Sequence, residues 1–263
     1  MLFDTHCHLN YHTDEELTRI IKNAKDFGLR YIMHAGARPD EIDREIEICN
    51  AFSDGELTIK CGFACHPEEV KKFGVLSVEE LKTVAGKDKN IIAIGETGLD
   101  THVPENEDFL GAQVRSFENH IEAALELNLP IIIHSRAEKA VARAVEMIQF
   151  YAKERNFRAV LHSYTGDIDN AKRALDCGVY ISFNGIATFK NAHEVREIAK
   201  IVPRDLMLVE TDAPFLSPVP MRGKPCETGY VYYTAKFLSQ FLDIDFDTFC
   251  NQTTENGRRL FGM

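Results

Sequence analysis

Two histidines near the start of the chain, His6 and His8, have the residue type and spacing of a metal site. They end a short hydrophobic run and have Cys7 between them. In a β-strand, residues i and i+2 point to the same face, so both imidazoles can enter one small volume while Cys7 points away. Imidazole is the commonest protein ligand for divalent transition metals. This pattern therefore predicts part of a metal centre at the end of a first strand.

Further histidines and carboxylates stand at or just after the ends of later apolar runs: Glu96, His134, His162, Glu210 and Asp212. Each alone is weak evidence, because a histidine at a strand end is usually structural and an acid there often caps a helix. Together they form a mixed set that suits Zn²⁺, Mn²⁺ or Mg²⁺ better than a thiolate site does. The set exceeds the needs of one tetrahedral ion. We therefore expect two divalent cations, which would make a hydroxide nucleophile available near neutral pH.

Eight short apolar runs supply the strands that would position these groups. They cover residues 2–6, 30–34, 57–63, 91–95, 130–134, 159–162, 179–183 and 206–210. Most of their residues are apolar, without strict alternation, as in parallel strands that are buried on both faces.

Amphipathic segments lie between these runs. One helix is expected over residues 13–27, where Thr13 and Glu16 form a capping-box pattern. Others are indicated by an apolar stripe over residues 110–125, by Ser77 and Glu80 before Leu81, and over residues 169–177 and 191–201. Alternating strands and helices predict a single α/β domain over residues 1–263, a (β/α)₈ TIM barrel. A doubly wound open sheet is the competitor, but the chain has no GxGxxG or Walker sequence to favour it.

Composition narrows the classes of function. The 263 residues carry a formal net charge of −11, which argues against broad electrostatic binding of duplex nucleic acid. The seven cysteines have no regular spacing, as expected for reduced thiols, and no apolar run is long enough to span a membrane. We expect a cytoplasmic location. His12, His120 and His193 are expected to be solvated, as is the helix face bearing the acidic run 41–47.

Five ordered motifs resemble the signature of the TatD family of metal-dependent deoxyribonucleases. They are residues 3–9 (FDTHCHL), 95–100 (GETGLD), 133–136 (IHSR), 162–166 (HSYTG) and 210–214 (ETDAP). Residues 182–185 and the proline-rich segment 218–224 are also similar to segments of that family, so the resemblance spans nearly the whole chain.

The resemblance implies an amidohydrolase-like (β/α)₈ barrel that hydrolyses phosphodiester bonds in DNA. By its motifs, His6, His8, Glu96 and Asp212 would hold one ion, and Glu96, His134 and His162 would hold a second, with Glu96 as the bridge. Asp212 would also orient the nucleophilic water as a general base. Glu210 would bind a third ion or support a ligand from behind.

Three residues are candidate substrate contacts. His66, in the pair His66-Pro67, matches a family histidine that would contact the substrate phosphate. Arg136 and Arg222 are candidates because guanidinium matches phosphate geometry, although a salt bridge to one of the many acids explains each nearly as well. The sequence departs from the family pattern at Phe63-Ala64-Cys65 and at Thr101-His102, which concerns the substrate-facing details more than the metal ligands.

Three functions stay open at this point. The first is a nuclease that acts on single strands or ends of DNA, with no membrane and no obligate protein partner. The second is a small-molecule amidohydrolase or phosphoesterase, because a polarising ion and a hydroxide serve either substrate. The third is a binding protein that has kept the barrel, which the intact ligand set disfavours.

Overall fold

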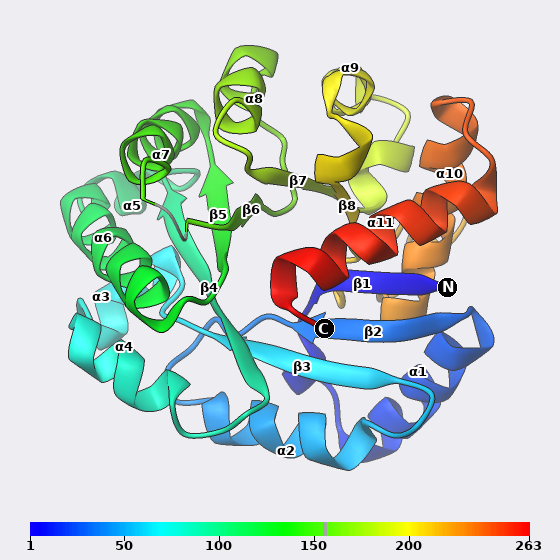
Figure 1. Cartoon of the computed structure of the whole chain (residues 1–263), viewed down its shortest axis with the longest axis horizontal. Coiled ribbons are helices and arrows are strands. Elements are labelled where there is room, and N and C mark those ends of the chain that lie inside the picture. Colours follow the sequence, from blue (N-terminus) through cyan, green and yellow to red (C-terminus); the bar gives the residue numbers. More distant parts are fainter. Residues whose placement is uncertain (155–156) are drawn as a thin grey trace.

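Eight parallel strands surround the centre of the molecule, and helices cover them on the outside (Figure 1). This is a computed structural model, which describes residues 1–154 and 157–263. The strands follow one another around the sheet in sequence order, from β1 to β8. The predicted (β/α)₈ barrel is therefore confirmed, and the doubly wound sheet is wrong.

The strands are found where the apolar runs predict them. They are β1 (Leu2–Cys7), β2 (Leu29–His34), β3 (Thr58–Phe63), β4 (Ile91–Asp100), β5 (Ile131–Arg136), β6 (Ala159–Leu161), β7 (Tyr180–Phe183) and β8 (Met207–Val209). Most ends fall within a residue or two of the prediction. The exception is β4, which continues beyond Gly95 to Asp100 and so carries Glu96 within the strand.

Helices fill the connections between the strands. The α-helices are α1 (Asp14–Asp26), α2 (Ile42–Phe52), α3 (Val70–Phe73), α4 (Val78–Ala85), α5 (Pro104–Glu107), α6 (Leu110–Leu127), α7 (Glu138–Tyr151), α8 (Ile168–Leu175), α9 (His193–Ile201), α10 (Val231–Phe241) and α11 (Phe246–Phe261). Short 3₁₀ turns include η1 (Leu9–Tyr11), η2 (Pro67–Glu69) and η5 (Thr228–Tyr230). The predicted capping box of Thr13 with Glu16 is present, and the helix start expected at Ser77 and Glu80 also forms one.

The hydrophobic core has two parts. The larger part lies between the strands and the surrounding helices. The smaller part includes strand residues such as Phe3, Met33, Ile132 and Leu208, together with Phe261 at the end of α11. In barrels of this kind such strand side chains fill the interior, so the chemistry is left to the carboxyl ends of the strands.

The barrel closes between β1 and β8 through a few specific bonds. The Asp212 N–H donates to the His6 carbonyl oxygen at 2.9 Å, and the His8 N–H donates to the Ala213 carbonyl oxygen at 2.8 Å. An isolated parallel bridge also joins Cys7 to Ala213. The closure therefore runs directly through residues that the sequence assigns to the metal centre.

Two expectations of solvated side chains are wrong. His120 is fully buried in α6, where its Nε2 accepts a hydrogen bond from the Cys65 N–H at 3.0 Å. Glu45, within the acidic run 41–47, is only 1% exposed. The seven cysteines are all free thiols, and Cys7 points away from its two neighbouring histidines, toward the Met33 carbonyl. Among the described residues, no helix has the length and apolar character to cross a membrane.

Candidate metal centre

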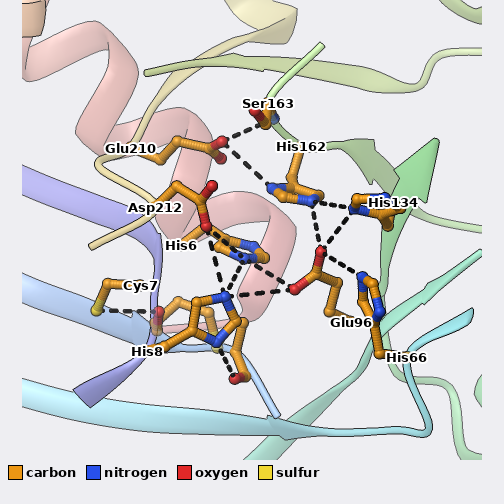
Figure 2. Close-up of polar contacts among 12 residues, drawn as sticks. His6, Cys7, His8, His66, Glu96, His134, His162, Ser163, Glu210 and Asp212 are labelled. Carbon is orange, nitrogen blue, oxygen red and sulfur yellow. Dashed lines mark hydrogen bonds and ion pairs between the residues drawn. The ribbon is translucent and has the colours of Figure 1, made fainter. Parts of the chain in front are cut away.

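Imidazoles and carboxylates from five strands converge at one end of the barrel (Figure 2). They lie in, or directly after, β1, β4, β5 and β6 and in the segment after β8: His6, His8, Glu96, His134, His162 and Asp212. Asp212 has a left-handed backbone, with φ of 60°, which is uncommon for a residue other than glycine. The predicted ligands thus meet in one place although they lie far apart in the sequence.

Four donor atoms, from His6, His8, Glu96 and Asp212, lie close together. The Nε2 atoms of His6 and His8 are 3.3 Å apart. Glu96 Oε2 lies 3.3 Å from His6 Nε2 and 3.4 Å from His8 Nε2. Asp212 Oδ1 lies 3.7 and 3.5 Å from the same two nitrogens. Ligands about 2.0–2.1 Å from a tetrahedral ion would lie roughly 3.3 Å from one another, so this donor set fits a divalent cation.

The other oxygen of Glu96 faces a second group of histidines. Glu96 Oε1 lies 2.7 Å from His162 Nε2, 2.9 Å from His134 Nδ1 and 3.4 Å from His66 Nε2. His134 Nδ1 and His162 Nε2 are themselves 3.3 Å apart. The two oxygens of this carboxylate therefore face two adjacent sets of nitrogen donors, as those of a residue that bridges two cations must.

Electrostatics keeps this carboxylate ionised. Burial alone would raise the pKa of Glu96, but the charges of His162, His66 and His6 hold it well below its ordinary value. Burial also acts to raise the pKa of Asp212, and its bond to His8 with the charge of His6 lowers it below the usual range. Both groups are thus carboxylates at neutral pH, the form that binds metal.

Asp100 supports His134 from the side away from Glu96. Its Oδ2 lies 2.9 Å from His134 Nε2, and its Oδ1 accepts the His102 N–H at 2.7 Å. A carboxylate behind a ligating imidazole fixes the tautomer and the ring orientation. Sequence reasoning missed this role. The signal was available, because residues 96 and 100 share a face if the strand continues through both.

Glu210 occupies a similar place beside His162, at a longer distance and without a hydrogen bond to His162 Nδ1 among the described residues. It is fully buried, and its Oε1 lies 3.4 Å from His162 Nδ1 and accepts the Ser163 N–H at 2.7 Å. Figure 2 shows it behind His162, on the side away from Glu96. Of the two roles that the sequence left open, this geometry favours support of a ligand over a third ion.

A cavity of about 570 Å³ opens over the centre. His66 and Arg136 line it, together with Glu96, His134, His162 and Asp212. Arg136 is exposed and takes part in none of the ion pairs found within residues 1–154 and 157–263. Arg222 does not line the cavity; its guanidinium lies 3.9 Å from the Phe189 ring centroid and donates to the Ser217 carbonyl at 3.3 Å.

Comparison with known proteins identifies the family. The profile described as "TatD related DNase" matches residues 3–262. The chain belongs to the TatD family. The uncharacterized metal-dependent hydrolase YabD of Bacillus subtilis is 36% identical over 99% of both chains. The uncharacterized metal-dependent hydrolase YcfH of Escherichia coli K12 is 33% identical, over 99% of this chain and 95% of its own.

Solved structures of TatD proteins share the fold. The TatD homologue YJJV of Escherichia coli K12 superposes with a TM-score of 0.89 at 21% identity, covering 100% of this chain and 98% of its own. A TatD family hydrolase from Entamoeba histolytica gives a TM-score of 0.81 at 19% identity, covering 99% and 97%. The predicted resemblance is confirmed, and this chain is a metal-dependent hydrolase of the TatD type.

Proposed function

We propose that this TatD protein is a deoxyribonuclease that hydrolyses phosphodiester bonds with two divalent cations. The observation that carries the proposal is the arrangement at Glu96, whose two oxygens face separate sets of donors. Two cations a few ångströms apart can stabilise both the attacking and the leaving oxygen of a phosphoryl displacement. The family profile, which is described as a DNase, supports the same reaction.

His6, His8, Glu96 and Asp212 would hold one ion. Glu96, His134 and His162 would hold the second, and His66 is close enough to join them. Bound ions supply Lewis-acid polarisation of the phosphate and a water of lowered pKa. Whether the ions are Mg²⁺, Mn²⁺ or Zn²⁺ is set by availability as well as by these nitrogen and oxygen donors.

The chain's own side chains would complete the reaction. Glu96 would bridge the two ions, whereas Asp212 would bind only one. Asp212 also borders the cavity, so it can accept the proton of a water there. Arg136 and His66 border the same cavity and would bind the phosphate. Arg222 stays a prediction, since its guanidinium packs on Phe189 instead.

The substrate is best matched by single strands or ends of DNA. The net charge of −11 disfavours tracking along a duplex, whose binding depends on many basic contacts. Bound cations and Arg136 would supply the positive charge locally. The free thiols are consistent with a reducing compartment, so we keep the cytoplasm as the expected location.

The test is digestion of end-labelled single-stranded DNA with Mg²⁺, Mn²⁺ or Zn²⁺ present. We expect metal-dependent shortening that is abolished by EDTA. Glu96→Ala should lose nearly all activity, because it removes a ligand shared by both ions. Metal content, measured by inductively coupled plasma mass spectrometry, should fall in the same variant.

Glu146→Ala is the matched control, because Glu146 is an exposed acid on α7 whose only ion pair among the described residues is with Arg143. Wild-type rates in Glu96→Ala would refute the two-ion site. If wild type leaves DNA intact with every metal but hydrolyses a panel of small esters or amides, the alternative of a small-molecule amidohydrolase or phosphoesterase replaces the nuclease.

A further inference from the structure

Two aromatic side chains at the rim of the cavity take no part in the chemistry above. Tyr11 is the last residue of η1, which begins directly after His8. Phe215 lies three residues after Asp212, whose carbonyl accepts the Phe215 N–H at 2.9 Å. Their ring centroids are 5.6 Å apart, with an interplanar angle of 77°. Both rings line the cavity. Each is therefore fixed to a segment that also carries a metal ligand.

Both aromatic rings are exposed to solvent, which contributes nothing to the stability of the fold. Tyr11 is 60% exposed and Phe215 is 49% exposed. Scattered exposed aromatics are ordinary, but two in mutual contact beside a polar catalytic cavity form a patch that fits a ligand. Their ring centroids lie 6.0 and 6.4 Å from that of His8. The patch is thus directly beside the proposed metal ligands.

The wall opposite this patch has different chemistry. β1 and β8, which lead to Tyr11 and Phe215, close the ring of strands, while β3, β4 and β5 lie across it. His66 follows β3, and Arg136 ends β5. The cavity therefore has an apolar aromatic side and a polar side with Arg136, His66, Glu68 and Glu69, and the residues of the proposed metal centre lie between them.

We propose that Tyr11 and Phe215 bind the base of the nucleotide next to the scissile phosphate, and that they thereby select single-stranded substrate. The inference rests on the proposed nuclease function and extends it to a base-binding site. In a nucleotide, a single sugar joins the aromatic base to the phosphate. This arrangement matches two aromatic rings that lie next to His8, one of the proposed metal ligands. A base within a duplex has both faces covered by its neighbours, whereas an end or a single strand offers a free face.

Kinetics with matched substrates test this site. The substrates are short single-stranded oligonucleotides with either a normal nucleotide or a stable abasic residue beside the cleaved bond. Tyr11→Ala and Phe215→Ala should raise KM for the normal substrate by roughly five- to a hundredfold, from the usual loss of one stacked ring. For the abasic substrate, the two alanine variants should have the same KM as wild type, and kcat should change little. Tyr11→Phe, which keeps the ring, should have the wild-type KM.

A fluorescence measurement tests the same site without hydrolysis. The chain contains no tryptophan, so Tyr11→Trp places a single reporter at the rim. Added to the metal-loaded variant, an oligonucleotide with hydrolysis-resistant phosphorothioate linkages should quench this fluorescence, and its abasic counterpart should not. Phe150, on α7 and 67% exposed, supplies the controls Phe150→Ala and Phe150→Trp.

The outcomes separate this site from the function on which it rests. Equal increases in KM for normal and abasic substrates, or no base-dependent quenching of Tyr11→Trp, would overturn the base-binding site even if DNA is digested. Conversely, if the wild-type protein digests no DNA, the proposed nuclease function is overturned but the base-binding site is not. Base-dependent quenching would then still support Tyr11 and Phe215 as a site for an aromatic base.

Discussion

The carboxylate of Asp100 decides which nitrogen of His134 faces the metal centre. Asp100 Oδ2 lies 2.9 Å from His134 Nε2, so that nitrogen carries the proton and Nδ1 is left toward Glu96. Burial acts to lower the pKa of His134, but its bonds to Asp100 and Glu96 raise it above the ordinary value. The binding of a cation must displace any proton from Nδ1, and Asp100 keeps the ring aligned while this happens.

Asp100→Asn should therefore weaken metal binding. An amide has one acceptor oxygen, so it cannot serve both His134 Nε2 and the His102 N–H as the carboxylate does. Loss of such support typically costs about 10–100-fold in metal affinity or activity. Isothermal titration calorimetry with Zn²⁺ or Mn²⁺ measures the change. Asp108→Asn, at an exposed position in the segment that follows β4, is the control, and unchanged affinity in Asp100→Asn would show that Asp100 is only structural.

At the scale of elements, apolar runs located every strand but did not mark where β4 ends. Beyond Gly95 that strand is polar, with Glu96, Thr97 and Asp100, and it persists because it pairs with β5 as far as Arg136. This pairing is a tertiary effect that hydrophobicity does not encode. The ligands were predictable because they lie at or near the ends of apolar runs, whereas Asp100 was missed because it lies beyond the predicted end of β4.

Helix α2 shows a second limit. Its buried face consists of Ile42, Glu45, Ile48 and Cys49, which follow helical spacing, so the periodicity places Glu45 inward. The charge of Glu45 had instead suggested a solvated side chain. Neither carboxylate oxygen of Glu45 has a hydrogen-bond partner among the described residues. Burial, with smaller contributions from Cys61 and Glu41, holds the pKa of Glu45 well above its ordinary value.

Glu45→Met should accordingly stabilise the protein, and more so at higher pH. The folded state keeps a proton on Glu45 that the unfolded chain releases above a pKa of about 4.3. Stability is therefore lost as pH rises from that value toward the raised folded pKa. We expect a gain of about 1–3 kcal/mol near pH 8 and a smaller one near pH 5, measured by urea unfolding.

The control is Glu47→Met, because the Glu47 side chain is 71% exposed on the same helix. It should leave stability nearly unchanged at both pH values. A gain for Glu45→Met that is equal at pH 5 and pH 8 would mean that Glu45 does not titrate differently in the two states.

For the molecule as a whole, the bonds that close the barrel run through residues of the proposed metal centre. Asp4 in β1 is fully buried and accepts hydrogen bonds from Thr211 N at 2.8 Å, Thr211 Oγ1 at 2.6 Å and Thr228 Oγ1 at 2.6 Å. It thus joins the first strand to the segment after β8 and to the start of the final helices. Thr211 precedes Asp212, so this network also fixes the backbone of a proposed ligand.

Metal binding should in turn stabilise the whole barrel, since the proposed ligands lie at the ends of five strands. At a free metal concentration about 100 times Kd, the gain is about 2.7 kcal/mol, or roughly 5–10 °C in Tm for a domain of this size. Removal of the metal with EDTA should lower Tm by that amount in a thermal melt. Asp4→Ala leaves the Thr211 N–H without its acceptor and should cost about 2–4 kcal/mol.

The decisive quantity is the response of Asp4→Ala to metal. Because Asp212 loses its backbone support, the variant should bind metal more weakly and show a smaller fall in Tm with EDTA than wild type. Asp26→Ala, which removes an exposed acid paired with Lys22, should keep the full response. If Asp4→Ala melts at a lower temperature yet keeps the wild-type response to EDTA, closure and metal binding are independent, and Asp4 serves stability alone.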